Sequence, residues 1–111
     1  MTKSMDSCIF CKIASHIEPK SFTYEDEDIM VFPDTHPVKP VHLLIVPKKH
    51  YKDFIELSDA VLWNKIREVA QKLVGQFDLA DKGFRISING GGAQKIDHLH
   101  VHLMGPMGKM V

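Results

Sequence analysis

The segment HLHVHL at residues 98–103 alternates histidine with aliphatic residues. Strict alternation predicts a β-strand, in which successive side chains point to opposite faces. We therefore expect three histidines on one face and three aliphatic side chains in a core. At about 3.3 Å per residue, His98 and His102 lie roughly 13 Å apart, too far for both to bind one metal ion together with His100. The three rings therefore divide their roles or have none. An exposed strand with incidental histidines is the alternative, although it would use a scarce residue three times on one face.

Composition predicts one compact soluble domain over residues 1–111, with residues 1–7 polar and flexible. The chain is 44% hydrophobic and 25% charged, and its formal net charge is zero. This balance gives no general attraction to nucleic acid or to membrane surfaces, so small molecules or proteins are the expected partners. Without an apolar run of about 18 residues or a signal-peptide pattern, the expected location is the cytoplasm.

The only cysteines, Cys8 and Cys11, stand in the motif CIFC. A cytoplasmic location disfavours a disulfide, so the pair is interpreted as metal ligands or free thiols. A redox pair is the alternative, but such a motif normally follows a strand, and none is expected before residue 8.

Hydrophobic periodicity predicts five strands and two helices. Turn signals separate most of these segments, and Ser58 or Asp59 is the expected cap of the longer helix. The fold class is therefore α+β: a five-stranded antiparallel sheet with one long and one short helix. One main helix covers five strands poorly, which predicts a homodimer. The expected strands span residues 21–25, 29–33, 41–46, 84–89 and 98–103, and the expected helices span residues 8–15 and 58–79.

Four features must be explained together: the CxxC motif, His42 within an apolar strand, His50 at the end of PKKH, and the histidine strand preceded by glycines. Their order, from CIFCKI through EDEDIMVFPDTHPVKPVHLLIVPKKH and ISING to the last strand, resembles the histidine triad (HIT) family of nucleotide-binding hydrolases and transferases. The motif of that family is His-x-His-x-His followed by two apolar residues. The resemblance is strongest to Hint-like phosphoramidases and small bacterial HIT proteins, and it implies a HIT-like fold.

A neutral imidazole can attack the α-phosphorus of a nucleotide and form a nucleotidyl-histidine intermediate. The resemblance implies that His100 is this nucleophile and that His102 and His42 assist it. The implied activity is hydrolysis of nucleoside 5'-phosphoramidates or related adenylyl conjugates. Two alternatives stay open: hydrolysis of dinucleoside polyphosphates, and a zinc-stabilised dimer that binds a nucleotide or a partner without turnover.

The glycines at residues 90–92 allow backbone N–H groups to approach an anion, with Gln94 as a polar contact. The resemblance implies an AMP-like purine nucleotide, whose ribose hydroxyls are held by Asp34 beside Thr35. It also implies an apolar base pocket, although its three members could equally be plain core residues. The base-pocket residues are Phe10, Ile13 and Phe32, and the expected phosphate contacts are Asn89, Gly92, Ala93, Gln94 and Lys95, besides His100 and His102.

The resemblance also implies a zinc site made of Cys8, Cys11, His50 and His98. A Cys2His2 set is closed and tetrahedral, so the metal would be structural. The alternative is that the cysteines pack as small apolar residues. No motif for magnesium is evident.

Overall fold

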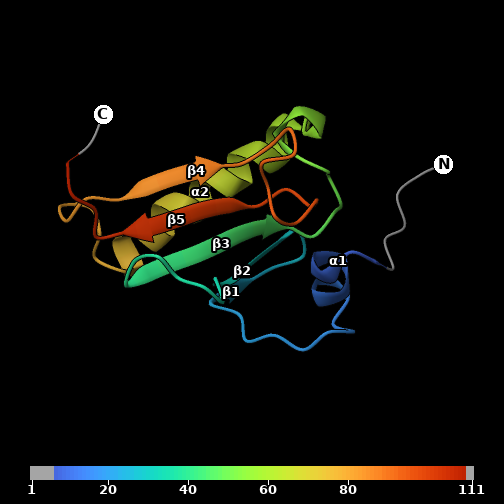
Figure 1. The fold of residues 1–111 in the computed structure, drawn as a ribbon, viewed down its shortest axis with the longest axis horizontal. Helices are drawn as coiled ribbons and strands as arrows, with labels where there is room; N and C mark the ends of the chain where they lie inside the picture. Colours follow the sequence, from blue (N-terminus) through green and yellow to red (C-terminus); the bar gives the residue numbers. More distant parts are fainter. Residues whose placement is uncertain (1–6, 110–111) are drawn as a thin grey trace.

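The computed structural model describes residues 7–109, so the prediction that residues 1–7 are flexible lies outside this range except for Ser7. Five strands form one antiparallel sheet in the order β1-β2-β3-β5-β4 (Figure 1). Two α-helices and a short 3-10 helix, η2, complete the fold. The elements are α1 (Ile9–Ala14), β1 (Tyr24–Glu25), β2 (Ile29–Pro33), β3 (Val41–Pro47), η2 (Phe54–Glu56), α2 (Ala60–Gln76), β4 (Arg85–Ile88) and β5 (Val101–Gly105).

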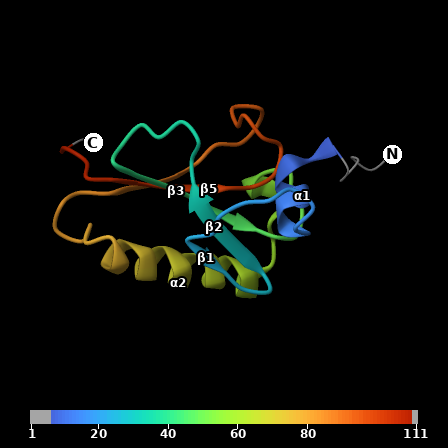
Figure 2. The same cartoon turned by 90° about the horizontal axis from the view of Figure 1, so that it is seen from below.

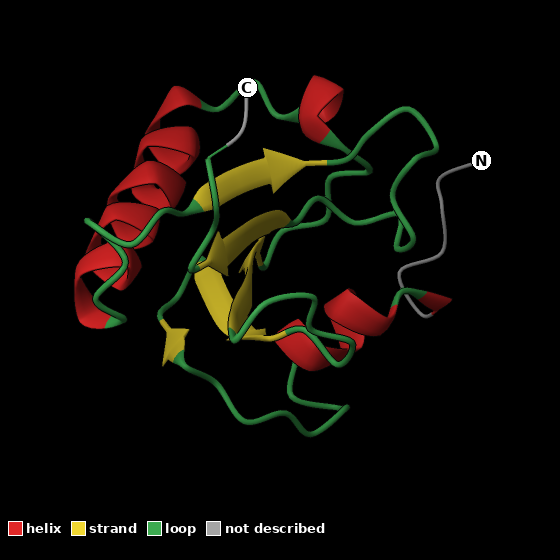
Figure 3. Ribbon diagram, turned by 60° about the vertical axis from the view of Figure 1, so that its left-hand side comes forward, coloured by secondary structure: helices red, strands yellow, loops and turns green. Residues whose placement is uncertain are grey.

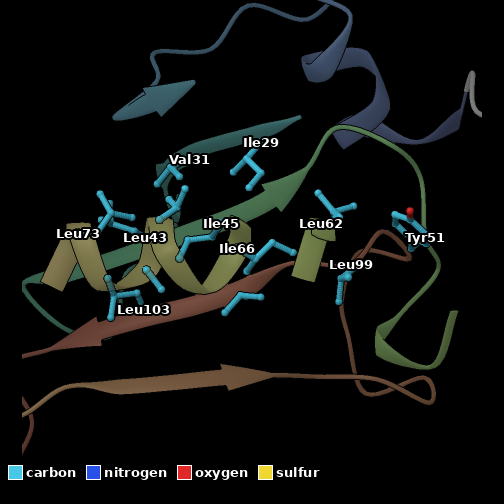
Figure 4. Packing of buried hydrophobic residues seen from close by; sticks show 13 residues of the cluster. Ile29, Val31, Leu43, Ile45, Tyr51, Leu62, Ile66, Leu73, Leu99 and Leu103 are labelled. Atoms are coloured by element: carbon cyan, nitrogen blue, oxygen red, sulfur yellow. The ribbon is translucent and has the colours of Figure 1, made fainter. Parts of the chain in front are cut away.

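The long helix α2 covers one face of the sheet (Figure 2). The buried apolar side chains of α2 recur at spacings of three and four residues. The Asp59 side chain is the N-cap and accepts hydrogen bonds from the N–H groups of Val61 and Leu62. The resulting core contains residues from the helix and from three strands (Figure 4). Complete burial of one aliphatic side chain such as Leu73 contributes about 1.5–3 kcal/mol. The labelled members are Ile29, Val31, Leu43, Ile45, Tyr51, Leu62, Ile66, Leu73, Leu99 and Leu103.

The short helix α1 lies on the other side of the sheet from α2 (Figure 3). Phe10 and Ile13 from this helix pack with a second set of strand side chains that faces away from α2. The strand members of this second core are Met30, Phe32, Leu44 and Val46. Both faces of the sheet therefore carry packed apolar side chains, and His102, which lies opposite Leu44, projects to the α1 side.

The register between β3 and β5 places two histidines near each other. His42 is opposite Met104, and Leu44 is opposite His102. Directly opposed residues in an antiparallel pair project to the same face, as do residues two apart along a strand. His42 and His102 therefore project from one face along a diagonal of the ladder.

The structure confirms the expected fold class but corrects the bounds of the last strand. β5 begins at Val101, so His98 and His100 precede it. The cause is a change of backbone partner, because the Leu99 N–H donates to the Tyr51 carbonyl beyond the end of β3. The alternation of faces survives this change, since Leu99 is fully buried in the α2 core.

Other bounds also differ from the sequence predictions. β1 and β4 are shorter than the predicted 21–25 and 84–89, and α2 is shorter than 58–79. β3 extends one residue beyond the predicted 41–46, because Pro47 pairs with Ile29 on β2. The 3-10 helix η2 was not predicted. None of the helices in residues 7–109 has the length and apolar character needed to span a membrane.

Candidate functional site

Four potential metal ligands converge where α1 meets the sheet. Cys8 caps α1 and Cys11 lies one turn later, whereas His50 follows β3 and His98 precedes β5. The Nδ1 atom of His98 lies 3.3 Å from the Cys8 Sγ and 3.5 Å from the Cys11 Sγ. The Nδ1 atom of His50 lies 3.2 Å from the Cys11 Sγ and 3.2 Å from the His98 Nδ1. Residues up to 90 positions apart thus meet in one cluster.

These separations match a tetrahedral metal site. With Zn–S near 2.3 Å and Zn–N near 2.05 Å, tetrahedral angles place sulfur and nitrogen about 3.6 Å apart and two nitrogens about 3.3 Å apart. His98 is fully buried, and its Nε2–H donates to the Pro47 carbonyl at 2.7 Å. This bond leaves the His98 Nδ1 lone pair directed at the cluster, the usual arrangement of a histidine ligand. The four groups therefore fit zinc.

A second group contains Asp34, His42 and His102. The His42 Nε2 lies 2.9 Å from the His102 Nδ1 and 3.3 Å from the Asp34 Oδ2. On the far side of the ring, the His42 Nδ1 accepts the Val38 N–H at 3.1 Å. A backbone N–H can only donate, so in neutral His42 the proton resides on Nε2 and is donated to His102. This proton and the short N···N separation identify a hydrogen bond rather than a metal site.

His102 is the end of this chain of bonds. Because its Nδ1 accepts from His42, neutral His102 carries its proton on Nε2. This Nε2 is buried and has no hydrogen-bond partner among the described residues. Burial lowers the pKa of His102, and the nearby His100 and His42 lower it further, against the opposing effect of Asp34. His102 therefore favours the neutral form and offers one N–H donor.

His100 has the opposite tautomer. Its Nδ1 lies 2.8 Å from the His98 carbonyl, which can only accept, so Nδ1 carries the proton and Nε2 carries a lone pair. The His100 and His102 ring centroids are 5.0 Å apart. The structure thus brings a ring nitrogen with a lone pair and a ring N–H donor together at the two residues to which the resemblance assigns attack and assistance.

The expected ribose residues, Asp34 and Thr35, line a surface pocket together with Lys20. The Lys20 ammonium lies 4.9 Å from the centre of the Phe32 ring. The Asp34 Oδ1 accepts a hydrogen bond from the His36 N–H, which stabilises the turn that follows β2. The three expected base-pocket residues, Phe10, Ile13 and Phe32, are all buried in the second core.

The glycine loop differs from the expected open anion cradle. The Gly91 N–H donates to the Asp53 carboxylate at 3.0 Å, and the Gly92 N–H donates to the Gln94 Oε1 at 2.9 Å. These two donors are used within the protein, and Gln94 is buried rather than open to a ligand. The remaining expected phosphate contacts, Asn89, Ala93 and Lys95, are exposed on or beside this loop.

Sequence reasoning missed Asp53. Its Oδ1 caps η2 by accepting the Ile55 N–H, while its Oδ2 accepts the Gly91 N–H. The bonds from Gly91 and then Ile55 lower the pKa of this carboxyl. The available signal was an aspartate at a helix start, but no local pattern indicates its contact with the glycine loop.

Comparison with known proteins identifies the family. Residues 7–111 match the family model described as scavenger mRNA decapping enzyme C-term binding. Protein HitA of Neisseria gonorrhoeae is 38% identical, over 91% of this chain and 97% of that protein. The solved structure of a HIT family hydrolase from Clostridium thermocellum has a TM-score of 0.87 and 37% identity, covering 97% of this chain and 99% of that one. The chain belongs to the HIT family.

Within this HIT protein, the two histidine groups lie on a fold shared with HIT family hydrolases. A second such structure, from Legionella pneumophila, has a TM-score of 0.85 at 38% identity and covers 92% of this chain and 95% of that one. A relative from Brassica juncea, 37% identical over 87% of this chain and 90% of that protein, is named a 14 kDa zinc-binding protein. The Cys2His2 cluster of this chain is compatible with the metal in that name.

Proposed function

We propose that this protein hydrolyses nucleoside 5'-phosphoramidates or related adenylyl conjugates through a nucleotidyl intermediate on His100. The observation that carries the proposal is the pairing of opposite tautomers. The Nδ1–H bond to the His98 carbonyl leaves the Nε2 lone pair of His100 available to attack phosphorus. The neighbouring His102 offers the complementary Nε2–H donor.

In the first step the His100 Nε2 forms a bond to the α-phosphorus while the phosphorus–nitrogen bond of the substrate breaks. The leaving amine departs with the electron pair of that bond and takes up a proton from solvent. The His102 Nε2–H donates to a phosphoryl oxygen, and His42 holds the His102 ring by donating its Nε2–H to the His102 Nδ1. Water then forms a bond to phosphorus and loses a proton to solvent while the bond from phosphorus to the His100 Nε2 breaks, which releases AMP and restores the lone pair on Nε2.

We propose that the nucleotide is AMP-like and that Asp34 and Thr35 bind its ribose hydroxyls. Their position on one surface pocket, beside the His42 and His102 pair, supports this role. Phosphate contacts from the glycine loop are proposed for its exposed members, Asn89, Ala93 and Lys95. Gly92 and Gln94 would have to exchange their mutual bond for a contact with phosphate.

The test is mass spectrometry after brief exposure to an AMP–amine conjugate. The wild-type protein is expected to carry one AMP on the peptide containing His100, and His100→Ala is expected to carry none and to release no AMP. His16→Ala is the matched control, because His16 is exposed and its ring pairs with the Glu25 carboxylate. Equal AMP release by wild type and His100→Ala contradicts the proposal.

The same assay separates the alternatives. Faster turnover of dinucleoside polyphosphates than of phosphoramidates assigns the protein to the former substrates. Tight AMP binding with no adduct and no turnover on either substrate assigns it to non-enzymatic nucleotide binding.

We propose that zinc occupies the cluster of Cys8, Cys11, His50 and His98 and has a structural role. Bound there, the metal would tether α1 to the ends of β3 and β5, with all four positions filled by protein. Reduced thiols suit this chemistry, which agrees with the proposed cytoplasmic location. Metal analysis of protein purified without chelator is expected to give one zinc per chain, and protein without zinc contradicts the proposal.

We propose that the protein is a homodimer formed through β4 and α2. β4 is an edge strand, and the apolar side chains of Phe84 and Ile86 are exposed beside Trp63 of α2. Together they line a largely apolar groove, and an edge strand with such a neighbour can pair with its own copy. Light scattering is expected to give twice the chain mass, and Ile86→Lys is expected to give the monomer. A monomeric wild-type protein contradicts this proposal.

A further inference from the structure

Asp53 is a buried carboxylate in an otherwise exposed stretch of the chain. Only 8% of its surface is exposed, whereas the next two residues, Phe54 and Ile55, are exposed to 49% and 83%. An aspartate is rarely buried unless its oxygens accept hydrogen bonds, and each Asp53 oxygen accepts one backbone N–H. The bond from Ile55 caps η2, and the bond from Gly91 joins η2 to the glycine loop. A helix cap needs only the first of these two bonds.

The loop that contains the glycines spans residues 89–97, and it begins and ends beside His100. β4 ends at Ile88, which pairs with Val101 of β5, so the antiparallel register brings the next residue, Asn89, to the level of His100. The other end of the loop leads directly into His98. The shape of the loop therefore determines which of its N–H groups face a phosphate at His100.

Hydrogen bonds are the main restraint on the glycines of this loop. Gly91 and Gly92 have φ angles of +66° and +97°, a backbone region that other residues rarely adopt. In the described part of the chain, a Cβ on either glycine would have no atom within 4 Å apart from its chain neighbours. Packing on that side therefore does not fix the conformation of either residue.

The two glycine N–H groups have acceptors of different strength. The Gly91 N–H donates to the Asp53 carboxylate at 3.0 Å, and the Gly92 N–H donates to the neutral Gln94 Oε1 at 2.9 Å. The bonds from Gly91 and then Ile55 lower the pKa of Asp53, which keeps this carboxyl ionised at neutral pH. A hydrogen bond to a charged group is roughly twice as strong as one between neutral groups. A phosphate can thus replace Gln94 at Gly92 while the bond from Gly91 to Asp53 persists.

The residues before Asp53 contact the same part of the protein. The Tyr51 carbonyl accepts the Leu99 N–H at 2.7 Å. The Lys52 carbonyl accepts a hydrogen bond from the side-chain Nε2–H of Gln94 at 3.4 Å. Three consecutive residues therefore bind the chain on either side of the glycines, and Asp53 is the one that binds a glycine directly.

We propose that Asp53 is a positioning residue that anchors the glycine loop at Gly91, so that the Gly92 N–H and its neighbours stay directed at the phosphate of the nucleotide. The inference rests on the proposed function, which assigns phosphate contacts to this loop. Loss of the anchor weakens the binding of a phosphate group and leaves the binding of a nucleoside unchanged, because a nucleoside has no phosphate. Loss of a general structural support weakens both.

The experiment measures the binding of AMP and of adenosine to the wild-type protein and to Asp53→Ala by calorimetry. The Kd for AMP is expected to rise about threefold to tenfold, because a loop that is no longer pre-organised must be ordered on binding. The Kd for adenosine is expected to stay within twofold. Amide hydrogen exchange at Gly91 is expected to become faster in the variant. Zinc content is measured for each protein, so that metal loss is separated from loss of the anchor.

Glu56→Ala is the matched control, because the exposed Glu56 stabilises the start of η2 by accepting the Lys52 N–H at 2.6 Å. It is expected to weaken η2 while both Kd values and the exchange rate at Gly91 stay as in wild type. If Asp53→Ala does not fold, the same comparison is made with Asp53→Gly, since glycine is well tolerated as a helix N-cap and also lacks both oxygens.

An unchanged Kd for AMP in Asp53→Ala overturns the proposal, as does a lower one, which would mean that the carboxylate repels phosphate. Equal rises for AMP and adenosine also overturn it, and so does an equal effect of Glu56→Ala, which would assign the result to η2. Wild-type protein that binds AMP no more tightly than adenosine overturns it too, because the loop then makes no phosphate contact. Failure of the proposed hydrolysis is a different outcome, since His100 would then form no AMP adduct while the Kd values still report on the loop.

Discussion

Two groups of side chains in this protein contain histidine, and the arrangement of the ring nitrogens differs between them. In the cluster of Cys8, Cys11, His50 and His98, four pairs of ligand atoms lie 3.2–3.5 Å apart, and both histidines present Nδ1 to the cysteine sulfur atoms. In the group around His42 and His102, the two nitrogens lie 2.9 Å apart and one ring is fixed by a backbone N–H. The distances of the first group suit four lone pairs around an ion, and those of the second suit a shared proton.

The backbone decides the difference. The Pro47 carbonyl accepts a hydrogen bond from the His98 Nε2–H, which leaves the Nδ1 lone pair facing the cysteines. The Val38 N–H donates a hydrogen bond to the His42 Nδ1, so the proton of neutral His42 resides on Nε2. A carbonyl neighbour thus leaves a lone pair on the other ring nitrogen, as on His98 and His100, whereas an amide neighbour leaves an N–H donor there, as on His42.

The strongest test of this division is His102→Ala. Removal of the N–H donor beside His100 is expected to lower kcat by about 10²–10⁴-fold, the usual range for a positioned proton donor or acceptor. Zinc content is expected to stay as in wild type, because no atom of His102 belongs to the metal cluster. Turnover within threefold of wild type would place the assistance elsewhere.

The opposite test is Cys11→Ser, which removes one ligand from the metal cluster. The variant is expected to lose zinc and about 4 kcal/mol of stability, the contribution of a metal present at 1,000 times its dissociation constant. Urea unfolding with parallel metal analysis measures both. Chelated wild-type protein is expected to match the variant, and chelator is expected to leave the variant unchanged. Equal stability of wild type with and without chelator would assign the cysteines to packing alone.

A smaller effect is expected for Asp34→Asn. The amide keeps an acceptor for the His36 N–H but loses the charge that the proposal assigns to the ribose hydroxyls. KM is expected to rise about tenfold, as for the loss of a hydrogen bond to a charged group. Asp28→Asn, at an exposed carboxylate, is the control. If kcat falls instead and KM is unchanged, Asp34 acts through His42, which lies 3.3 Å from it.

The smallest expected effect is a pH dependence of stability. Burial lowers the pKa of His102 in the folded protein, so below about pH 6.5 the unfolded chain binds a proton that the folded chain does not. Stability therefore falls as the pH drops below that value, until the lowered pKa is reached. His102→Gln is expected to lose part of this slope between pH 7.5 and 5.5 in urea unfolding. An unchanged slope would show that His102 is not the group responsible.

Local patterns predicted much of this fold. Alternation in residues 98–103 correctly placed Leu99 and Val101 in the core, and spacing by three and four correctly predicted a helix within residues 58–79, with Asp59 as one of its two candidate caps. Such periodicities are properties of neighbouring residues, so the sequence alone contains them. The start of β5 was predicted wrongly, because it depends on where β3 ends and on the bond from Leu99 to Tyr51.

The sequence by itself therefore determined which side chains share a face and which residue types are available to bind a metal or attack phosphorus. Only the tertiary structure decided what each histidine does with its proton. His98, His100 and His42 are assigned by the Pro47 carbonyl, the His98 carbonyl and the Val38 N–H. The tertiary structure also decided the role of the glycine loop, because the Gly91 N–H donates to the carboxylate of Asp53, 38 residues away. Hydrogen bonds and metal sites join groups that are distant in sequence, and no local period encodes such a pairing.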